Sequence, residues 1–343
     1  MLSETPSNRT SIGLIGCGSH LLSAHVLPCR EQFREGAVTV TGAFDPASAQ
    51  MDAISVACPR AIQYRSLEQL LRQPELSGVF IGSPDPFHAD QTLQSISAGK
   101  HVFVEKPLAV DSSSLQVALC AIREARDRKL SLLICHPKRF DPVYEWVRDF
   151  ITNQSNEFDG LKEIHVTLSA GHPAGSWSEN RWIIFDHVSH QIDLVHYLTN
   201  TTALYFEVIR NDFLQYEISG KLPLGTEIYL GARRALDEAE RREVISIRFN
   251  RGHLTVEPFR GFATLVRGNS ETVTFDLPRP QFNHRSKAIT EHAISMWQHS
   301  GKVAYLAWDD VIISASAPVA LSARTYWDVP IGTLSLPGRI ASD

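Results

Sequence analysis

The chain has 343 residues, of which 43% are hydrophobic and 21% are charged, and its formal net charge is −5. A chain of this length typically forms about two domains, and these fractions are ordinary for globular proteins. The mild negative charge gives no general attraction to nucleic acid or to an anionic membrane surface. No apolar run approaches the roughly 18–20 residues that span a membrane.

The chain also lacks the sequence features of an exported or disulfide-stapled protein. Its polar first residues do not have the charged-then-apolar order of a signal peptide. The five cysteines include no C-x-x-C pair, so they predict buried thiols in a reducing compartment, not a disulfide framework or a zinc site. We therefore expect a cytoplasmic protein with no nucleic-acid or membrane partner.

Residues 11–136 alternate short apolar segments with helical patterns, which predicts a doubly wound parallel sheet of the Rossmann type in a domain spanning residues 1–136. Helical patterns begin after Ser66 and after Asp111, and another ends at Gly99, which suits a left-handed cap. The expected strands are rich in β-branched and aromatic residues. They are Ser11–Gly16, Val38–Asp45, Gly78–Ser83, His101–Lys106 and Ser131–His136.

The first two strands end in candidate cofactor-binding residues. The first runs into Gly16-Cys17-Gly18-Ser19-His20, where two glycines permit a tight turn and a close approach of a pyrophosphate to the next helix. Leu21 replaces the third glycine of G-x-G-x-x-G, so either the helix packs less closely or the turn differs by one residue. The Asp45 carboxylate can accept hydrogen bonds from the adenosine ribose and would repel a 2′-phosphate, which favours NAD over NADP. The alternative is that Asp45 only starts a turn, as Asp before Pro often does.

Two further strand ends lie at the same edge of this sheet. Ser83, Pro84 and His88 belong to a loop that we expect to line the nicotinamide ribose, and for His88 we favour a helix cap over a catalytic role. The next strand ends in Glu105-Lys106-Pro107. A lysine at the carboxyl end of a buried strand can bind a substrate oxygen and stabilise a developing alkoxide, although an exposed lysine before a turn is the simpler alternative.

After residue 136 the pattern changes to strand-like runs separated by hairpin-like Gly and Asn positions. We expect a second, α+β domain over residues 137–343 with a large, mostly antiparallel sheet. The runs are Glu163–Ser169, Ala203–Arg210, Val244–Phe249, His253–Pro258, Ala263–Arg267 and Thr272–Leu277.

One segment of this domain, residues 184–198, has a helical pattern with chemically active residues. Asp186, His190 and Asp193 share one helix face at i, i+4 and i+7. A histidine beside a carboxylate can take a proton from a hydroxyl, whereas the simpler alternative is a solvated polar face. His187 and His190 have no second cluster of ligands nearby in the sequence, so we expect no metal site.

In this order along the chain, the motifs resemble the Gfo/Idh/MocA oxidoreductase family over about residues 11–330. They are Gly16-Cys17-Gly18, Glu105-Lys106-Pro107 after Ala98-Gly99-Lys100, Arg139-Phe140, and Asp186-x-x-x-His190-x-x-Asp193. The resemblance implies a Rossmann domain for NAD(P) and an open-faced α/β domain for substrate and oligomer contacts. It implies that Lys106 contacts the nicotinamide ribose and the substrate, that Asp186 orients the substrate, that His190 transfers the proton and that Asp193 supports them.

The sequence departs from the family pattern at several positions. Leu21 replaces a glycine, and Pro137 stands where many members have Asn. His187 and Ser189 occupy positions near the substrate where many members have a small residue or glycine. These last differences leave the identity of the substrate open. Five further residues are candidate substrate ligands, because aromatic, amide and cationic side chains suit a polyhydroxylated ring. The alternative is that they are ordinary residues of surface loops. They are Lys138, Arg139, Trp177, Asn180 and Arg181.

We therefore expect an NAD-dependent oxidoreductase that acts on a secondary hydroxyl of a sugar, an inositol or a related cyclic polyol and forms a homodimer or homotetramer. His190 is the expected general base, and Lys106 stabilises the oxyanion. The alternatives are an NAD-retaining enzyme that cleaves glycosides, an imine or enone reductase of secondary metabolism, and a non-catalytic NAD-binding regulator.

Overall fold

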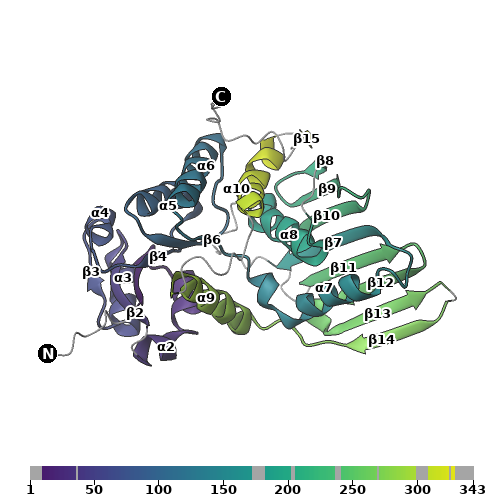
Figure 1. Cartoon of the computed structure of the whole chain (residues 1–343), viewed down its shortest axis with the longest axis horizontal. Helices are drawn as coiled ribbons and strands as arrows, with labels where there is room; N and C mark the ends of the chain where they lie inside the picture. Colours follow the sequence, from purple (N-terminus) through teal and green to yellow (C-terminus); the bar gives the residue numbers. More distant parts are fainter. Residues whose placement is uncertain are drawn as a thin grey trace. The chain divides into compact units, whose positions relative to one another are not determined.

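The structure is a computed structural model that describes residues 10–35, 38–171, 182–201, 205–235, 241–268, 270–298, 308–323 and 326–328. The chain divides into two compact units, each drawn in Figure 1. The first comprises Met1–Pro137 and Phe282–Ile312, and the second comprises Lys138–Gln281 and Ile313–Asp343. Helix α9 (Phe282–Gln298) thus belongs to the first unit, because its Trp297 packs against Phe80 with ring centroids 5.4 Å apart. The sequence placed all residues after 136 in the second domain.

The first unit contains a six-stranded parallel sheet, which confirms the Rossmann prediction. The strand order is β3-β2-β1-β4-β5-β6. Every residue of β1 and β4 is buried, because the sheet is covered on both faces. The strands are β1 (Thr10–Ile15), β2 (Val38–Phe44), β3 (Ile62–Gln63), β4 (Gly78–Ile81), β5 (His101–Val104) and β6 (Leu132–Ile134). The sequence missed β3, which has only two residues, both exposed.

The helices of this unit begin and end as their caps indicate. Ser66 accepts a hydrogen bond from the Gln69 amide at 3.2 Å, Asp111 accepts one from the Ser114 amide at 2.7 Å, and Gly99 has a φ of 77° after its helix. The helical segments are α1 (Ser19–Leu21), the π-helical turn η1 (Leu22–Val26), α2 (Arg30–Glu35), α3 (Ser48–Ala57), α4 (Leu67–Leu71), η2 (Asp85–Phe87), α5 (His88–Ser97) and α6 (Ser112–Asp127).

The turn after β1 differs from the usual dinucleotide turn where Leu21 replaces glycine. Gly16 has a φ of 74°, and a Cβ there would lie 2.2 Å from the Ser83 backbone nitrogen. The Leu21 side chain packs against Gly82, which has no side chain. A Cβ on Gly82 would lie only 2.9 Å from Leu21 Cβ. The π-helical turn η1 follows, and a π turn contains an extra residue. A glycine in the neighbouring strand end therefore makes room for the leucine.

The second unit contains a nine-stranded sheet in the order β14-β13-β12-β11-β7-β10-β9-β8-β15, which confirms the mostly antiparallel prediction. The β7–β10 pair is parallel. The strands are β7 (Leu161–Gly171), β8 (Tyr205–Asn211), β9 (Gln215–Lys221), β10 (Glu227–Ala235), β11 (Arg242–Phe249), β12 (Gly252–Glu257), β13 (Phe262–Arg267), β14 (Thr272–Asp276) and β15 (Tyr326–Asp328). The sequence missed β9 and β10, although buried residues alternate along both.

Helices of the second unit pack on one face of this sheet, as Figure 1 shows for α7 (Pro142–Gln154) and α8 (Ile183–Thr199). Helix α8 packs on β9 and β10, and α7 packs on α8. Ile313, Ala317 and Leu321 of α10 (Trp308–Ala323) join the same core. Short 3-10 segments are η3 (Pro137–Phe140) and η5 (Pro258–Arg260). Within the described ranges, no helix has both the length and the apolar character needed to cross a membrane.

The close approach at Gly16 predicts a large effect of adding one methyl group. Gly16→Ala should lower the free energy of unfolding by about 2 kcal/mol or more, because the Cβ strikes backbone atoms and φ is positive. Gly18→Ala is the matched control, because a Cβ there meets no part of the described structure within 4 Å, and we expect it to cost less than about 1 kcal/mol. Urea unfolding measures both, and equal losses would contradict the prediction.

Candidate active site

The turn after β1 has the features of a phosphate-binding turn. Gly18 is the N-cap of α1, and the space above it is open, since an added Cβ would contact no atom of the described residues within 4 Å. Asp45, at the end of β2, accepts from the Cys17 amide at 2.7 Å and from the Ala47 amide at 2.8 Å. Asp45 therefore shapes both turns, which is the turn-forming role that the sequence left as an alternative. Ser19, the first residue of α1, lies beside Gly18.

His88 connects two loops of the first unit. It is buried, its Nδ1 lies 2.9 Å from the Pro107 carbonyl oxygen, and its Nε2 lies 2.7 Å from the Ser83 carbonyl oxygen. Burial lowers the pKa of His88. The N-cap of α5 is Phe87, so the helix cap that the sequence favoured for His88 is wrong. Its ring instead joins the loop that contains Ser83 and Pro84 to the residue after Lys106.

Glu105 is the centre of a buried polar cluster that immediately precedes Lys106. His25 Nε2 and His20 Nε2 lie 2.7 Å and 3.1 Å from Glu105 Oε1, and the Lys106 amide donates to Oε2 at 3.3 Å. Burial alone would raise the pKa of Glu105, but the hydrogen bonds from His20 and His25 outweigh it and hold that pKa well below its usual range. Glu105 is therefore ionised at neutral pH.

Two histidines of this unit, His20 and His25, contact Glu105 in this cluster. Its hydrogen bond to Glu105 raises the pKa of His20, a residue that the sequence proposed for cofactor binding. The sequence missed His25, which lies in the π-helical turn and has no motif around it. The ligand-type atoms of His20, His25 and Glu105 lie within 4.8 Å of one another, a grouping that could hold a metal ion. The direct hydrogen bonds already account for their convergence.

In the second unit, both acidic residues of α8 are buried. Asp186 and Asp193 are 3% and 4% exposed, so the solvated polar face that the sequence left as an alternative is wrong. His190, one turn after Asp186, is partly buried. Burial raises the pKa of Tyr216 well above its usual value, and the nearby negative charges of Asp186 and Glu243 add to this effect. A buried carboxylate and an imidazole one turn apart suit acid–base chemistry.

A glutamine anchors α8 to the sheet. Gln191 donates from Nε2 to the carbonyl oxygens of Val166 at 3.2 Å and Gly231 at 2.8 Å, and its Oε1 accepts from the Tyr216 hydroxyl at 2.7 Å. These bonds join α8 to β7, β9 and β10. The position of His190, the preceding residue, is therefore set by one strand that precedes α8 in the sequence and two that follow it.

Two candidate substrate ligands have ion-pair partners within the second unit. Arg139 donates to Asp193 from Nε at 3.0 Å and from Nη2 at 2.7 Å. Lys138 pairs with the fully buried carboxylate of Glu243, which also accepts from the Tyr144 hydroxyl. The two pairs join η3 to α8 and β11. The sequence missed Glu243, although it occupies an inward position next to Ile245 and Ile247 on the same strand.

Three other candidate substrate ligands, Trp177, Asn180 and Arg181, lie outside the described residues. Lys106, which follows β5, is partly buried.

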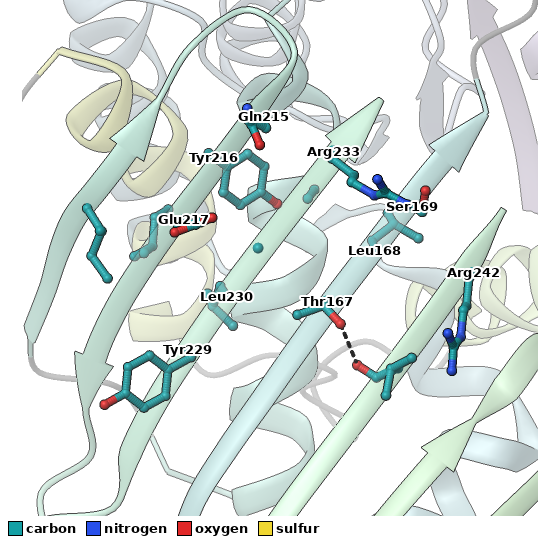
Figure 2. A pocket seen from close by; sticks show the side chains of 15 residues that line it. Thr167, Leu168, Ser169, Gln215, Tyr216, Glu217, Tyr229, Leu230, Arg233 and Arg242 are labelled. Atoms are coloured by element: carbon teal, nitrogen blue, oxygen red, sulfur yellow. Dashed lines mark hydrogen bonds between the residues drawn. The ribbon is translucent and has the colours of Figure 1, made fainter. Parts of the chain in front are cut away.

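A hollow of about 410 Å³ lies on the sheet face that α8 does not cover (Figure 2). Side chains of Glu217, Tyr229 and Arg233 surround it, and Gly231 contributes no side chain, which deepens it. None of the catalytic candidates lines this hollow. It is therefore a feature of the exposed sheet face and not of the candidate acid–base helix.

Comparison with known proteins identifies relatives of about half of this chain. Residues 10–133 match the Gfo/Idh/MocA model, described as an oxidoreductase family with an NAD-binding Rossmann fold. The 1-carboxy-3-chloro-3,4-dihydroxycyclohexa-1,5-diene dehydrogenase of Comamonas testosteroni is 27% identical over 54% of this chain and 47% of its own length. Inositol 2-dehydrogenase of Corynebacterium glutamicum is 24% identical over 59% of this chain and 58% of its own. The match thus spans about half of each of these relatives.

Solved structures resemble nearly the whole chain. Levoglucosan dehydrogenase in complex with NADH and levoglucosan has a TM-score of 0.77 and 15% identity, over 94% of this chain and all of the other. The UDP-N-acetylglucosamine 3-dehydrogenase of Acidithiobacillus ferrooxidans has a TM-score of 0.73 and 19% identity, over 92% and 97%. At this identity the likeness establishes the fold.

The buried Lys138–Glu243 pair predicts an asymmetric mutational effect. Lys138→Met should lower the free energy of unfolding by about 3 kcal/mol, because the Glu243 side chain is 0% exposed and loses its cation. Adding Glu243→Gln should recover most of that loss. Lys221→Met is the control, since its pair with Glu227 is exposed and should contribute less than about 1 kcal/mol. Chemical denaturation measures all four proteins, and no recovery in the double variant would contradict the prediction.

Proposed function

Since residues 10–133 belong to the Gfo/Idh/MocA family of oxidoreductases with an NAD-binding Rossmann fold, we propose that this protein is an NAD-dependent dehydrogenase. Its substrate is a secondary hydroxyl of a sugar, an inositol or a related cyclic polyol. The observation that carries the proposal is the buried Asp186 with His190 one turn later on α8. A carboxylate kept from solvent beside an imidazole is an arrangement typical of proton transfer at hydroxyls.

Each residue has a defined part in the proposed reaction. His190 takes the hydroxyl proton, the Lys106 ammonium stabilises the oxygen as negative charge develops on it, and Asp186 accepts a hydrogen bond from a neighbouring hydroxyl. The bound NAD⁺ supplies the hydride acceptor. Open space above Gly18 and the amino end of α1 fit its pyrophosphate. Ser83, Pro84, His88 and Glu105 support the nicotinamide end. Trp177, Asn180 and Arg181 remain proposed substrate ligands.

The names of the relatives support this substrate class. One is named for a dihydroxylated carbon ring, one for inositol, and one solved structure for levoglucosan. Each of these names denotes a ring that bears hydroxyl groups. A ring polyol therefore fits the proposed roles of His190 and Asp186, which need two neighbouring hydroxyls.

Turnover tests the proposal directly. Purified protein is incubated with NAD⁺ and a panel of inositols, aldoses, aminosugars and sugar phosphates, and NADH is followed by its absorbance. Lys106→Ala and His190→Ala should each lower kcat by roughly 10²–10⁴-fold and leave NAD⁺ affinity nearly unchanged. Lys162→Ala and His284→Ala are matched exposed controls. Wild-type turnover in either active-site variant would refute the assigned roles, and a silent panel would refute the substrate class.

Asp45 is the basis of the preference for NAD over NADP that we propose. Asp45→Asn keeps a side-chain oxygen for the Cys17 or Ala47 amide but removes the charge that repels a 2′-phosphate. The ratio of NADP⁺ affinity to NAD⁺ affinity should rise roughly ten-fold or more, since one charge contact is worth about that factor. Calorimetric titration with both dinucleotides measures it, and an unchanged ratio would show that other groups determine the preference.

Association of copies through the exposed sheet face is the proposed route to a homodimer or homotetramer. Ile209 and Val266 on that face are 59% and 39% exposed, and apolar side chains there favour burial against another surface. The hollow around Gly231 can receive side chains from a second copy.

A further inference from the structure

A hydrogen-bonded chain in the first unit begins at Thr290 on α9. Thr290 is fully buried, and its hydroxyl donates to the Ser286 carbonyl oxygen at 2.7 Å. Its Oγ1 also lies 2.8 Å from His25 Nδ1. The Thr290 hydroxyl therefore joins its own helix to the ring of His25.

The other nitrogen of the same ring faces Glu105. His25 Nε2 lies 2.7 Å from Glu105 Oε1, and an ionised carboxylate can only accept hydrogen bonds. Nε2 therefore carries the hydrogen of this bond, and the two nitrogens of the His25 ring connect Thr290 to Glu105. A buried polar chain is held in one arrangement only when each of its groups has a hydrogen-bond partner. The Thr290 hydroxyl is the partner of the ring nitrogen that faces away from Glu105.

The helix geometry allows a second imidazole to reach the same oxygen. His20 and His25 are five residues apart, and on a regular α-helix such residues point about 140° apart. The π-helical turn over Leu22–Val26 is wider, so both rings reach Glu105 Oε1, with ring centroids 6.3 Å apart. Glu105 Oε2 accepts from the Lys106 amide. The backbone of Lys106 is thus attached to this cluster.

We propose that Thr290 is a positioning residue for Lys106, acting through His25 and Glu105. This inference rests on the proposed function only where it concerns turnover. The chain reaches Thr290 after eight of the nine strands of the second sheet, so a residue remote in sequence completes the support of the strand end that precedes Lys106. A zinc-class ion at the same three groups is the competing explanation, and it requires a His25 Nε2 without a hydrogen.

The Thr290→Val variant tests the proposal, because valine keeps the shape and removes the hydroxyl. Nitrogen-15 spectra of the histidine rings should show a hydrogen on His25 Nε2 in the wild type, with the signal assigned by its loss in His25→Asn. In Thr290→Val the Nδ1 signal should shift or vanish. With the ring polyol and NAD⁺, kcat should fall roughly ten-fold while NAD⁺ affinity changes less than about three-fold. Thr290→Ser should restore both the spectrum and the turnover.

A matched control separates positioning from a general effect on packing. Thr92 on α5 is also fully buried, and its Oγ1 has no hydrogen-bond partner among the described residues. Thr92→Val should leave the His25 signals and turnover unchanged. A His25 Nε2 without a hydrogen in the wild type would overturn the proposal, as would a Thr290→Val protein with wild-type spectrum and turnover. Because the spectra need no substrate, an inactive wild type would refute the proposed function and still leave the state of His25 measured.

Discussion

Burying an ionised carboxylate costs several kcal/mol unless a cation and hydrogen bonds meet it. This constraint recurs through both units. Glu105 is met by His20 and His25, Glu243 by Lys138 and Tyr144, and Asp193 by Arg139. Each carboxylate therefore binds a side chain from another element of its unit. Glu105 also accepts from the Lys106 amide, and Asp193 lies on the same helix as His190, so these pairs hold the backbone near both residues.

In the first unit, the packing around Leu21 compensates for the missing third glycine of the G-x-G-x-x-G motif. Leu21 replaces a glycine that normally lets helix and strand approach, and Gly82 on the neighbouring strand end provides the missing space. The π-helical turn η1 then changes the direction in which later side chains point and brings His25 to Glu105. A substitution that weakens the sequence motif is thus linked to a polar cluster that the motif does not contain.

Much of the fold follows from local patterns. The apolar strands separated by capped helices predicted the parallel sheet, because a strand buried on both faces needs a continuous apolar run. The short exposed β3 gave no such signal, and β9 and β10 were missed although their buried residues alternate. Helix α9 has an ordinary amphipathic sequence, so nothing local shows that Trp297 packs on Phe80 of the first unit.

The sequence by itself determined the two-sheet architecture, the glycine turn after the first strand, the position of Lys106 after a buried strand and the shared helix face of Asp186 and His190. Periodicity and turn chemistry act between near neighbours, so they can be read along the chain. Only the tertiary structure decided that Lys138 and Arg139 pair with Glu243 and Asp193, that His88 bridges two loops, and that Thr290 reaches His25. These contacts join residues up to 265 positions apart, and burial, which makes each one strong, is a property of the folded chain alone.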